Sequence, residues 1–369
     1  MSHALTAAVV FITTAAVSSL LVSKAIVLSR HLGLVDRPGP RRAHQVPMPR
    51  GGGLAIYLAF AVGVALTFSL DVERIGTETE RLLLLLAAGG MLAGTMVYDD
   101  ALGLSPRVKL AWQFGAAALV VMPRLRGAGH GIVIEQFNAP VGGDVVVLPL
   151  AVALAFTVFW IVGMANALNL VDGLDGLAAT VTLVACAVLF AHTYFRPEGD
   201  PQFTISLLPL ALGGAVVGFL RYNWHPAKII MGDSGAYFLG FALAVIAIIG
   251  GAKIATASLA LGLPILDVAW LIAYRSFHGR SPVSADRGHL HHRLVDAGLS
   301  PAQVAAYVGG ISAVFGGLAL VLPSRELKLV ALALTGVVLL GTVAVLAWRD
   351  RRRGGQGAAV RPGIVGPPK

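Results

Sequence analysis

Apolar stretches long enough to cross a lipid bilayer recur along the whole chain and constrain its fold more than any other feature. A helix rises about 1.5 Å per residue, so an apolar bilayer core of about 30 Å needs roughly 20 helical residues. Because unpaired backbone groups are too costly inside a bilayer, each stretch is expected to be a helix. About eleven such windows can be placed, at residues 4–28, 52–70, 82–98, 108–122, 146–165, 173–192, 205–220, 235–250, 254–274, 303–322 and 329–348.

The composition supports this interpretation, since 56% of the 369 residues are apolar and only 13% are charged, unlike the make-up of soluble domains. The first window has no basic residue ahead of it and no small-residue cleavage site, so we interpret it as a retained helix. We predict an all-α polytopic membrane protein with about eleven transmembrane helices over residues 1–350. Residues 351–369 form a basic, Pro/Gly-rich tail that we expect to be disordered.

The distribution of Lys and Arg predicts the orientation of the chain in the cytoplasmic membrane. Placing the connection after the first window inside the cell gives the inner face the larger share of the basic residues, as the positive-inside rule requires. The N-terminus is therefore predicted outside and the C-terminus in the cytoplasm. No stripe of interleaved basic and aromatic residues indicates nucleic-acid binding, so the net charge of +9 points to inner-face loops and to contacts with anionic membrane lipids. A single cysteine, Cys186, excludes a disulfide framework and a thiolate zinc site.

With this orientation, the unusual polar clusters all fall on the inner face. The outer connections are short or simply charged, apart from 123–145, where a small hairpin is predicted from "HGIVIEQF" and "DVVVLPL". We therefore expect an active-site cleft at the cytoplasmic face. The five inner segments are "DRPGPRRAHQVPMPRGGG" (36–53), "YDD" (98–100), "NALNLVDGLDGL" (166–177), "RYNWHPAKIIMGDSG" (221–235) and "DRGHLHHRL" (286–294).

Asp99 and Asp100 are adjacent carboxylates at the end of the third window. Two like charges repel unless a cation or a proton relieves them, which implies a divalent metal or a raised pKa. Taken alone, a pair solvated in the headgroup layer explains them equally well.

The segment 166–177 interrupts an apolar run with polar side chains spaced by three residues. Each step of three drifts about 60° around a helix, so the set cannot face one way along a regular helix. Gly173 and Gly176 weaken the helix and allow close approach to a ligand. We predict a span that ends, turns over a ligand and begins again; the alternative is an ordinary turn with polar caps. The polar side chains are Asn166, Asn169, Asp172 and Asp175.

Two further aspartates lie at or within apolar windows. Asp233, between glycines before the eighth window, is suited to capping a helix and equally to holding a metal or facing a phosphate. Asp267, in "LPILDVAW", lies at some depth in the membrane, where an acid is functional by default or pairs with a neighbouring helix.

The basic residues of two inner loops suggest an anion site. "HLHH" supplies His289, His291 and His292 beside Arg287; with carboxylates dominating elsewhere, we prefer diphosphate binding over zinc, and the alternative is a solvated basic loop. In the first loop, arginines and His44 lie among prolines and glycines, which predict a shaped loop. The positive-inside rule accounts for these arginines but not for that rigidity.

In their order and spacing, the five segments resemble the polyprenyl-phosphate N-acetylhexosamine-1-phosphate transferase family, which includes the MraY and WecA types. The likeness runs from about residue 30 to residue 295. "HLHHRL" and "RRAHQVPMPR" resemble the branch that uses UDP-N-acetylglucosamine. The branch that uses UDP-N-acetylmuramoyl-pentapeptide typically has three consecutive histidines and a threonine in the first loop, and this sequence departs from that pattern.

The resemblance implies a reaction in which a polyprenyl phosphate of the inner leaflet attacks the β-phosphorus of UDP-N-acetylglucosamine. The products are polyprenyl-diphospho-N-acetylglucosamine and UMP, in the first membrane step of an envelope glycan. The cofactor is Mg²⁺, with Mn²⁺ as the alternative ion. Another UDP-N-acetylhexosamine or UDP-N-acetylmuramoyl-pentapeptide stays open as the alternative donor. The prenyl length, the downstream polymer and the oligomeric state, a homodimer included, stay open as well.

The resemblance also assigns roles to residues at matching positions. Asp233 is the metal-ligand position, and the paired acids Asp99 and Asp100 organise the metal or deprotonate the lipid phosphate. The acidic loop orients the nucleotide, metal or lipid phosphate through Asn166, Asn169, Asp172 and Asp175. The cationic loops hold the diphosphate, sugar or lipid phosphate through His44, Arg50, Arg287, His289, His291 and His292.

Two rival functions keep a polytopic fold. A transporter of polyprenol or nucleotide sugars would place charges near mid-membrane and often shows internal repeats, whereas these clusters lie at window ends and no repeat is visible. A scaffold in an envelope-polymer complex would have no need for the acidic motif positions.

Overall fold

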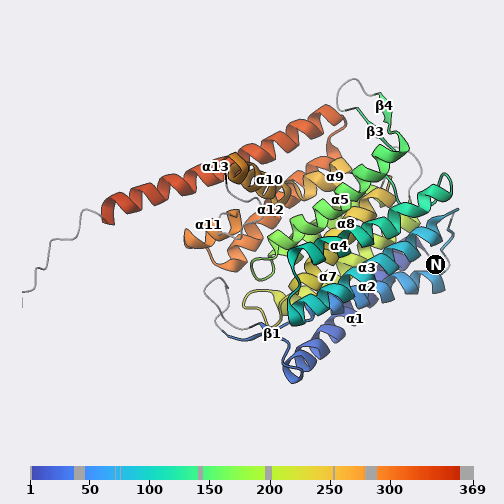
Figure 1. Ribbon diagram of the computed structural model, residues 1–369, viewed down its shortest axis with the longest axis horizontal. Coiled ribbons are helices and arrows are strands. Elements are labelled where there is room, and N and C mark those ends of the chain that lie inside the picture. Colours follow the sequence, from blue (N-terminus) through green and yellow to red (C-terminus); the bar gives the residue numbers. More distant parts are fainter. Residues whose placement is uncertain are drawn as a thin grey trace, which may run out of the picture.

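The computed structural model describes residues 2–36, 46–70, 72–74, 76–139, 144–195, 202–251, 254–277, 279 and 289–357, which form a bundle of long helices (Figure 1). The α-helices are α1 (His3–His31), α2 (Gly52–Ser69), α3 (Glu78–Leu102), α4 (Pro106–Val121), α5 (Leu150–Val171), α6 (Leu177–Tyr194), α7 (Phe203–Asn223), α8 (Gly232–Ile249), α9 (Ile254–Ala260), α10 (Gly262–Phe277), α11 (Leu290–Asp296), α12 (Pro301–Val321) and α13 (Arg325–Gly357). A 3-10 helix, η1 (Met122–Arg126), and four short strands complete the described part.

The predicted windows correspond to these helices, which confirms an all-α polytopic membrane protein. Nine helices of the described part are long and apolar enough to cross a membrane. Of the other two windows, the fourth became α4, which has 16 residues. The ninth was expected as one helix and is instead broken into α9 and α10 at Leu261. Pro264, in the first turn of α10, has no N–H to continue the α9 hydrogen-bond ladder, which accounts for the break.

The turn after α5 lies where a polar interruption was predicted, although its limits differ from the window drawn. The sixth window was placed from residue 173, but α6 begins at Leu177 and residues 172–176 form the turn. Gly176 has a φ of 75° and stands at the N-cap of α6. A side chain is strained at such a φ, so glycine is the residue that lets the chain reverse here.

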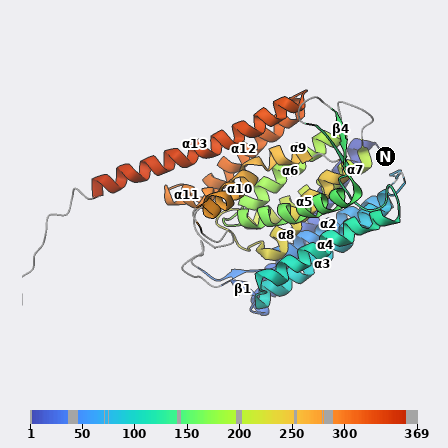
Figure 2. The ribbon, with the colours of Figure 1, turned by 45° about the horizontal axis from the view of Figure 1, so that its top comes forward.

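Helix α8 is the centre of the bundle. In its apolar window 89% of the residues are buried, against 22% for α13, which runs along the edge of the bundle in both views (Figures 1 and 2). Helices α2, α3 and α5 pack directly around α8. A helix that is apolar all round is either a core helix or lipid-facing; α8 is the first kind, and its polar first turn is therefore held in place by three neighbours.

Small residues make the closest helix crossings. A Cβ at Gly53 of α2 would overlap the backbone of Gly235 in α8, and a Cβ at Gly218 of α7 would lie 2.6 Å from Cβ of Ser18 in α1. Ser18 in turn donates a hydrogen bond of 2.5 Å to the carbonyl of Ala215. In lipid, helices associate through such close packing and hydrogen bonds because apolar burial offers little gain.

The two ends of the bundle carry different structures. The hairpin β3 (Gln136–Asn138) and β4 (Val145–Val147) is antiparallel, as predicted for 123–145, and lies at the same end as the N-terminus (Figures 1 and 2). The pair β1 (Val35–Asp36) and β2 (Met48–Pro49) lies with α11 at the opposite end. The described parts of the five polar segments lie at that second end.

The C-terminal boundary differs from the predicted tail. Helix α13 continues to Gly357, past residue 351 where the tail was expected to begin, and residues 358–369 lie outside the described residues. The division into a transmembrane domain and a disordered tail stays a prediction.

We expect Gly218→Ala to lower the thermal midpoint of the detergent-solubilised protein, because the added methyl group meets Ser18 at the α1–α7 crossing and overpacking costs about 1–3 kcal/mol. The matched control is Gly310→Ala in α12, where a Cβ meets nothing within 4 Å. Alanine favours a helix over glycine by about 1 kcal/mol, so this variant should melt no earlier than the wild type. Equal midpoints for the two variants would contradict the close-packed crossing.

Candidate active site

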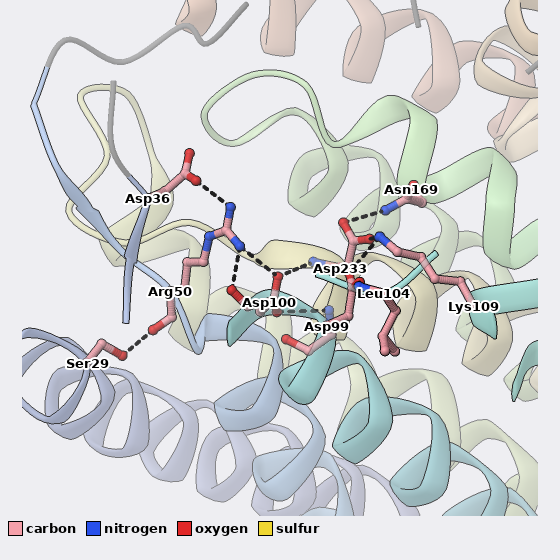
Figure 3. A network of polar contacts seen from close by, with 10 residues as sticks. Ser29, Asp36, Arg50, Asp99, Asp100, Leu104, Lys109, Asn169 and Asp233 are labelled. Atoms are coloured by element: carbon pink, nitrogen blue, oxygen red, sulfur yellow. Dashed lines mark hydrogen bonds and ion pairs between the residues drawn. The ribbon is translucent and has the colours of Figure 1, made fainter. Parts of the chain in front are cut away.

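Four helix termini bring the predicted acidic positions together at the end of the bundle that carries α11. The C-terminal turns of α3 and α5 meet the N-terminal turns of α4 and α8, and their side chains form one polar network (Figure 3). The network contains Asp99, Asp100, Lys109, Asn169 and Asp233, with Arg50 at its edge.

Asp100 caps the start of α8. Its carboxylate accepts hydrogen bonds from the backbone N–H groups of Asp233 at 3.1 Å and Ser234 at 3.2 Å. The first amide groups of a helix have no partner within the helix, so a carboxylate here satisfies donors that would otherwise be unpaired. A Cβ at Gly232 would lie 2.6 Å from the Asp100 carboxylate, and its φ is 74°. Glycine is therefore required for this approach.

Lys109 is the cation at the centre of the network. Its ammonium lies 2.6 Å from Asp99 and 2.6 Å from Asp233. Asp99 also accepts a hydrogen bond of 2.5 Å from the N–H of Leu104. The sequence predicts a divalent metal or a raised pKa at the paired acids. In the structure each acid has a cation of the protein beside it, Lys109 for Asp99 and Arg50 for Asp100.

Sequence reasoning missed Lys109, although a signal was present. A lysine at the edge of the apolar window 108–122 is a membrane-embedded charge, and such charges are expected to pair with a functional group. The same rule had drawn attention to Asp267.

The two asparagines of α5 point to different neighbours. Asn169 donates to Asp233 at 3.2 Å, whereas Asn166 donates to Gln113 of α4 at 2.5 Å and to the carbonyl of Val162 at 2.8 Å. Three residues turn a helix by about 300°, so successive members of the series rotate away from one face. Asn169 therefore belongs to the network, while Asn166 joins α5 to α4.

Asp172 follows the last residue of α5 and is the uncompensated acid of the site. Its half-buried side chain forms no hydrogen bond or ion pair with any residue that the structure describes. Burial, together with the charges of Asp233, Asp100 and Asp175, raises the pKa of Asp172 to about 8. Without an added cation, its carboxyl group is therefore mostly protonated at neutral pH.

Asp175 holds the turn 172–176 against the loop before α8. It lies 2.8 Å from Nδ1 of His225 and accepts a hydrogen bond of 3.1 Å from the N–H of Ala227. Nearby, buried Asn223 accepts from the N–H of Gly176 and donates to the carbonyl of Ile229. The predicted catalytic residue Asp175 is thus committed to contacts that shape the site.

Arg50, predicted to bind substrate, is committed to the protein's own carboxylates. Its guanidinium donates to the carbonyl of Asp100 at 2.6 Å and forms an ion pair with Asp36, and its backbone carbonyl accepts from Ser29. Asp36 is buried in β1 and was missed because a lone acid ahead of a basic loop carries little signal. These contacts tie the first inner loop to the end of α3.

The histidine segment reaches the turn 172–176. The ring of His291 lies against Gly173, where a Cβ would overlap Nε2, and this buried nitrogen has no hydrogen-bond partner among the described residues. Burial lowers the pKa of His291 to about 3, so the ring is neutral. His292 packs on it, with ring centroids 4.3 Å apart. His44 and Arg287, also predicted to bind substrate, lie outside the described residues.

The donor set at this end of the bundle suits a hard cation. No group of three or more His, Cys, Asp or Glu side chains is arranged to hold a metal ion within the described ranges. Mg²⁺ does not require one, because it commonly uses one or two carboxylates with waters and substrate phosphates. The unpaired carboxyl of Asp172 beside the charge of Asp233 is the feature that fits such an ion.

Comparison with known proteins gives a family match and several relatives that are similar over most of their length. The model of glycosyl transferase family 4 matches residues 82–251, which span α3 to α8. A probable undecaprenyl-phosphate N-acetylglucosaminyl 1-phosphate transferase of Bacillus subtilis is 34% identical over 81% of this chain and 80% of its own length. A decaprenyl-phosphate N-acetylglucosaminephosphotransferase of Mycobacterium tuberculosis is 33% identical over 80% and 78%.

A third relative is less similar in sequence and is named for the same kind of transferase. The undecaprenyl-phosphate alpha-N-acetylglucosaminyl 1-phosphate transferase of Escherichia coli is 26% identical over 75% of this chain and 73% of its own. The family match includes the four helix termini that carry Asp99, Lys109, Asn169 and Asp233. This multi-pass membrane protein belongs to glycosyl transferase family 4, among the polyprenyl-phosphate N-acetylhexosamine-1-phosphate transferases.

Proposed function

We propose that this protein transfers N-acetylglucosamine-1-phosphate from UDP-N-acetylglucosamine to a polyprenyl phosphate. The names of its relatives support the reaction. The observation that carries the proposal for this chain is the convergence of Asp99, Lys109 and Asp233 from three helix termini at one end of the bundle.

In this reaction an oxygen of the lipid phosphate attacks the β-phosphorus of the UDP-sugar. The bond between that phosphorus and the oxygen bridging to the α-phosphate breaks, and UMP leaves. One phosphoanhydride replaces another, so the equilibrium lies near unity and the reaction runs backwards with UMP. Several negative charges meet in the transition state, and positioned cations are the main means of stabilising them.

Mg²⁺, with Mn²⁺ as the alternative, is the proposed cofactor, and Asp233, Asp99 and Asp172 are the residues that would hold it. When bound, it would neutralise phosphate charge and polarise a phosphoryl oxygen. The ammonium of Lys109, now shared by Asp99 and Asp233, is a second positive charge within reach of the same phosphates.

The remaining acids are proposed to shape the site. Asp100 holds the first turn of α8 and so presents Asp233, and Asp175 holds the turn that carries Asp172. A strong general base is not needed, because the second pKa of a phosphate monoester is about 6 and the lipid phosphate is mostly ionised at neutral pH.

The orientation follows from the basic residues. With the site end in the cytoplasm, the UDP-sugar arrives from the cytosol and the lipid phosphate from the inner leaflet. The site then lies at the polar boundary of the membrane, where a water-soluble and a lipid substrate can meet. A homodimer and contacts of the tail with anionic lipids remain predictions.

The function is tested by exchange of labelled UMP into UDP-N-acetylglucosamine. We expect purified protein to catalyse it only with both polyprenyl phosphate and Mg²⁺, because the enzyme must form and reverse the lipid diphosphate. UDP-N-acetylmuramoyl-pentapeptide and other UDP-N-acetylhexosamines serve as competing donors. A transporter or a scaffold would give no exchange under any of these conditions.

Asp233→Asn should lower this exchange by about 10²–10³-fold, because it weakens the hold on the cation that would stabilise the transition state, and losing one such stabilising group costs about this much. The matched control is Asp144→Asn, the same chemical change on an exposed residue ahead of β4 at the opposite end of the bundle. The control should keep its wild-type rate. Near-normal exchange by the Asp233 variant at saturating Mg²⁺ would remove this residue from the chemistry.

Lys109→Met should lower turnover while strengthening the binding of Mn²⁺ to the substrate-free protein. The ammonium competes for Asp99 and Asp233, so its removal leaves two carboxylates that repel each other and favour a cation. Electron paramagnetic resonance of free Mn²⁺ measures the affinity. Lys24→Met, on the exposed face of α1, is the control, and equal affinity in both variants would argue against a shared site.

A further inference from the structure

Asp267 of α10 is a buried carboxylate that the proposed reaction does not use. Its side chain is 7% exposed. Oδ2 lies 3.0 Å from Nδ1 of His289, and Oδ1 accepts a hydrogen bond of 3.0 Å from the N–H of Leu290. Burying a carboxylate is costly unless its oxygens are hydrogen-bonded, and here both oxygens face donors of the histidine segment.

This arrangement determines which nitrogen of His289 carries the proton. A carboxylate only accepts hydrogen bonds, so Nδ1 beside it must be the protonated nitrogen. Nε2 is left for another partner, and no residue that the structure describes hydrogen-bonds to it. The ring is also held in direction, because it stacks on His291 with an interplanar angle of 13°.

The stack connects Asp267 with the turn that carries Asp172. His291 packs between His289 and Gly173, where there is no room for a side chain. The ring of His291 is neutral and buried, so it acts as a spacer between the two. The carboxylate on α10 thus sets the position of His289, and His291 links that ring to the acidic turn.

We propose that Asp267 is a positioning residue, which fixes the Nδ1–H form and the direction of His289 so that Nε2 faces the UDP-sugar. The inference rests on the proposed function for its kinetic consequence. The position of the proton on His289 is a property of the protein alone and does not depend on the proposed function.

Asp267→Asn tests this directly. In the wild type, the N–H of Leu290 and Nδ1–H of His289 donate to the two carboxylate oxygens, but an asparagine side chain has only one oxygen to accept a hydrogen bond. The N–H of Leu290 cannot give up its proton, but the imidazole can move its proton to Nε2. An asparagine therefore keeps the hydrogen bond to Leu290 with its oxygen and donates to Nδ1 with its amide nitrogen. The variant preserves the backbone contact and reverses the tautomer of His289.

The experiment is ¹⁵N NMR of histidine-labelled full-length protein in detergent micelles, with the His289 signals identified from their loss in His289→Gln. We expect the proton on Nδ1 in the wild type and on Nε2 in Asp267→Asn. We also expect exchange to fall about 10- to 100-fold, the loss that is typical when a group that orients a metal-binding histidine is removed.

A double variant separates positioning from folding. If Asp267 acts through His289, Asp267→Asn should cause no further loss of exchange when added to His289→Gln. If Asp267 has a purely structural role, Asp267→Asn should lower exchange by the same factor in the wild type and in His289→Gln. That result would overturn the proposal. Ser300→Ala, which removes the side-chain cap of α12, is the control for a general loss of stability and should leave the tautomer unchanged.

The outcomes distinguish this inference from the proposed function. Absence of exchange in the wild type would reject the proposed function, and the NMR result would still decide the role of Asp267. If the wild type catalyses exchange but His289 keeps its proton on Nδ1 in Asp267→Asn, the positioning role is rejected and the proposed function stands.

Discussion

The sharing of one ammonium group by two carboxylates is the interaction on which the site depends. Lys109 brings Asp99 and Asp233 together from different helices, and the amide groups of the first turn of α8 accommodate Asp100 beside them. Like charges at an apolar boundary would otherwise separate or take up protons. This arrangement lets Asp99, Asp100 and Asp233 lie close together at the ends of two helices.

The acids of the site differ in whether they have a partner among the described residues. Asp100 and Asp175 satisfy backbone N–H groups and fix the start of α8 and the turn 172–176. Asp172 has no such contact with the described residues, and its surroundings favour the protonated form. Under the proposed function, a metal would bind here together with the substrate phosphates and not alone, because the phosphates would complete its ligand set.

The central helix explains how such a site is held rigid in a membrane. Helix α8 is surrounded by α2, α3 and α5, and glycine crossings such as Gly53 with Gly235 let backbones approach closely. Hydrogen bonds hold the outer helices as well, since the carboxylate of Asp267 on α10 binds His289 and Leu290 at the start of α11. The carboxylates of Asp99, Asp100 and Asp267 are thus each paired inside the apolar bundle, as charged groups within a membrane require.

The sequence by itself determined the helical membrane fold, the hairpin in 123–145 and the segments that form the site, because hydropathy and polar interruptions are local properties of the chain. Hydropathy could not show that the ninth window breaks, or that α6 starts at Leu177. Only the tertiary structure showed which of these residues have partners within the protein. Asp100, Asp175 and Arg50 contact residues distant along the chain, whereas Asp172 forms no hydrogen bond or ion pair with a described residue. Lys109 and Asp36 were missed for the same reason, since charge pairing depends on distances between helices that spacing along one helix does not contain.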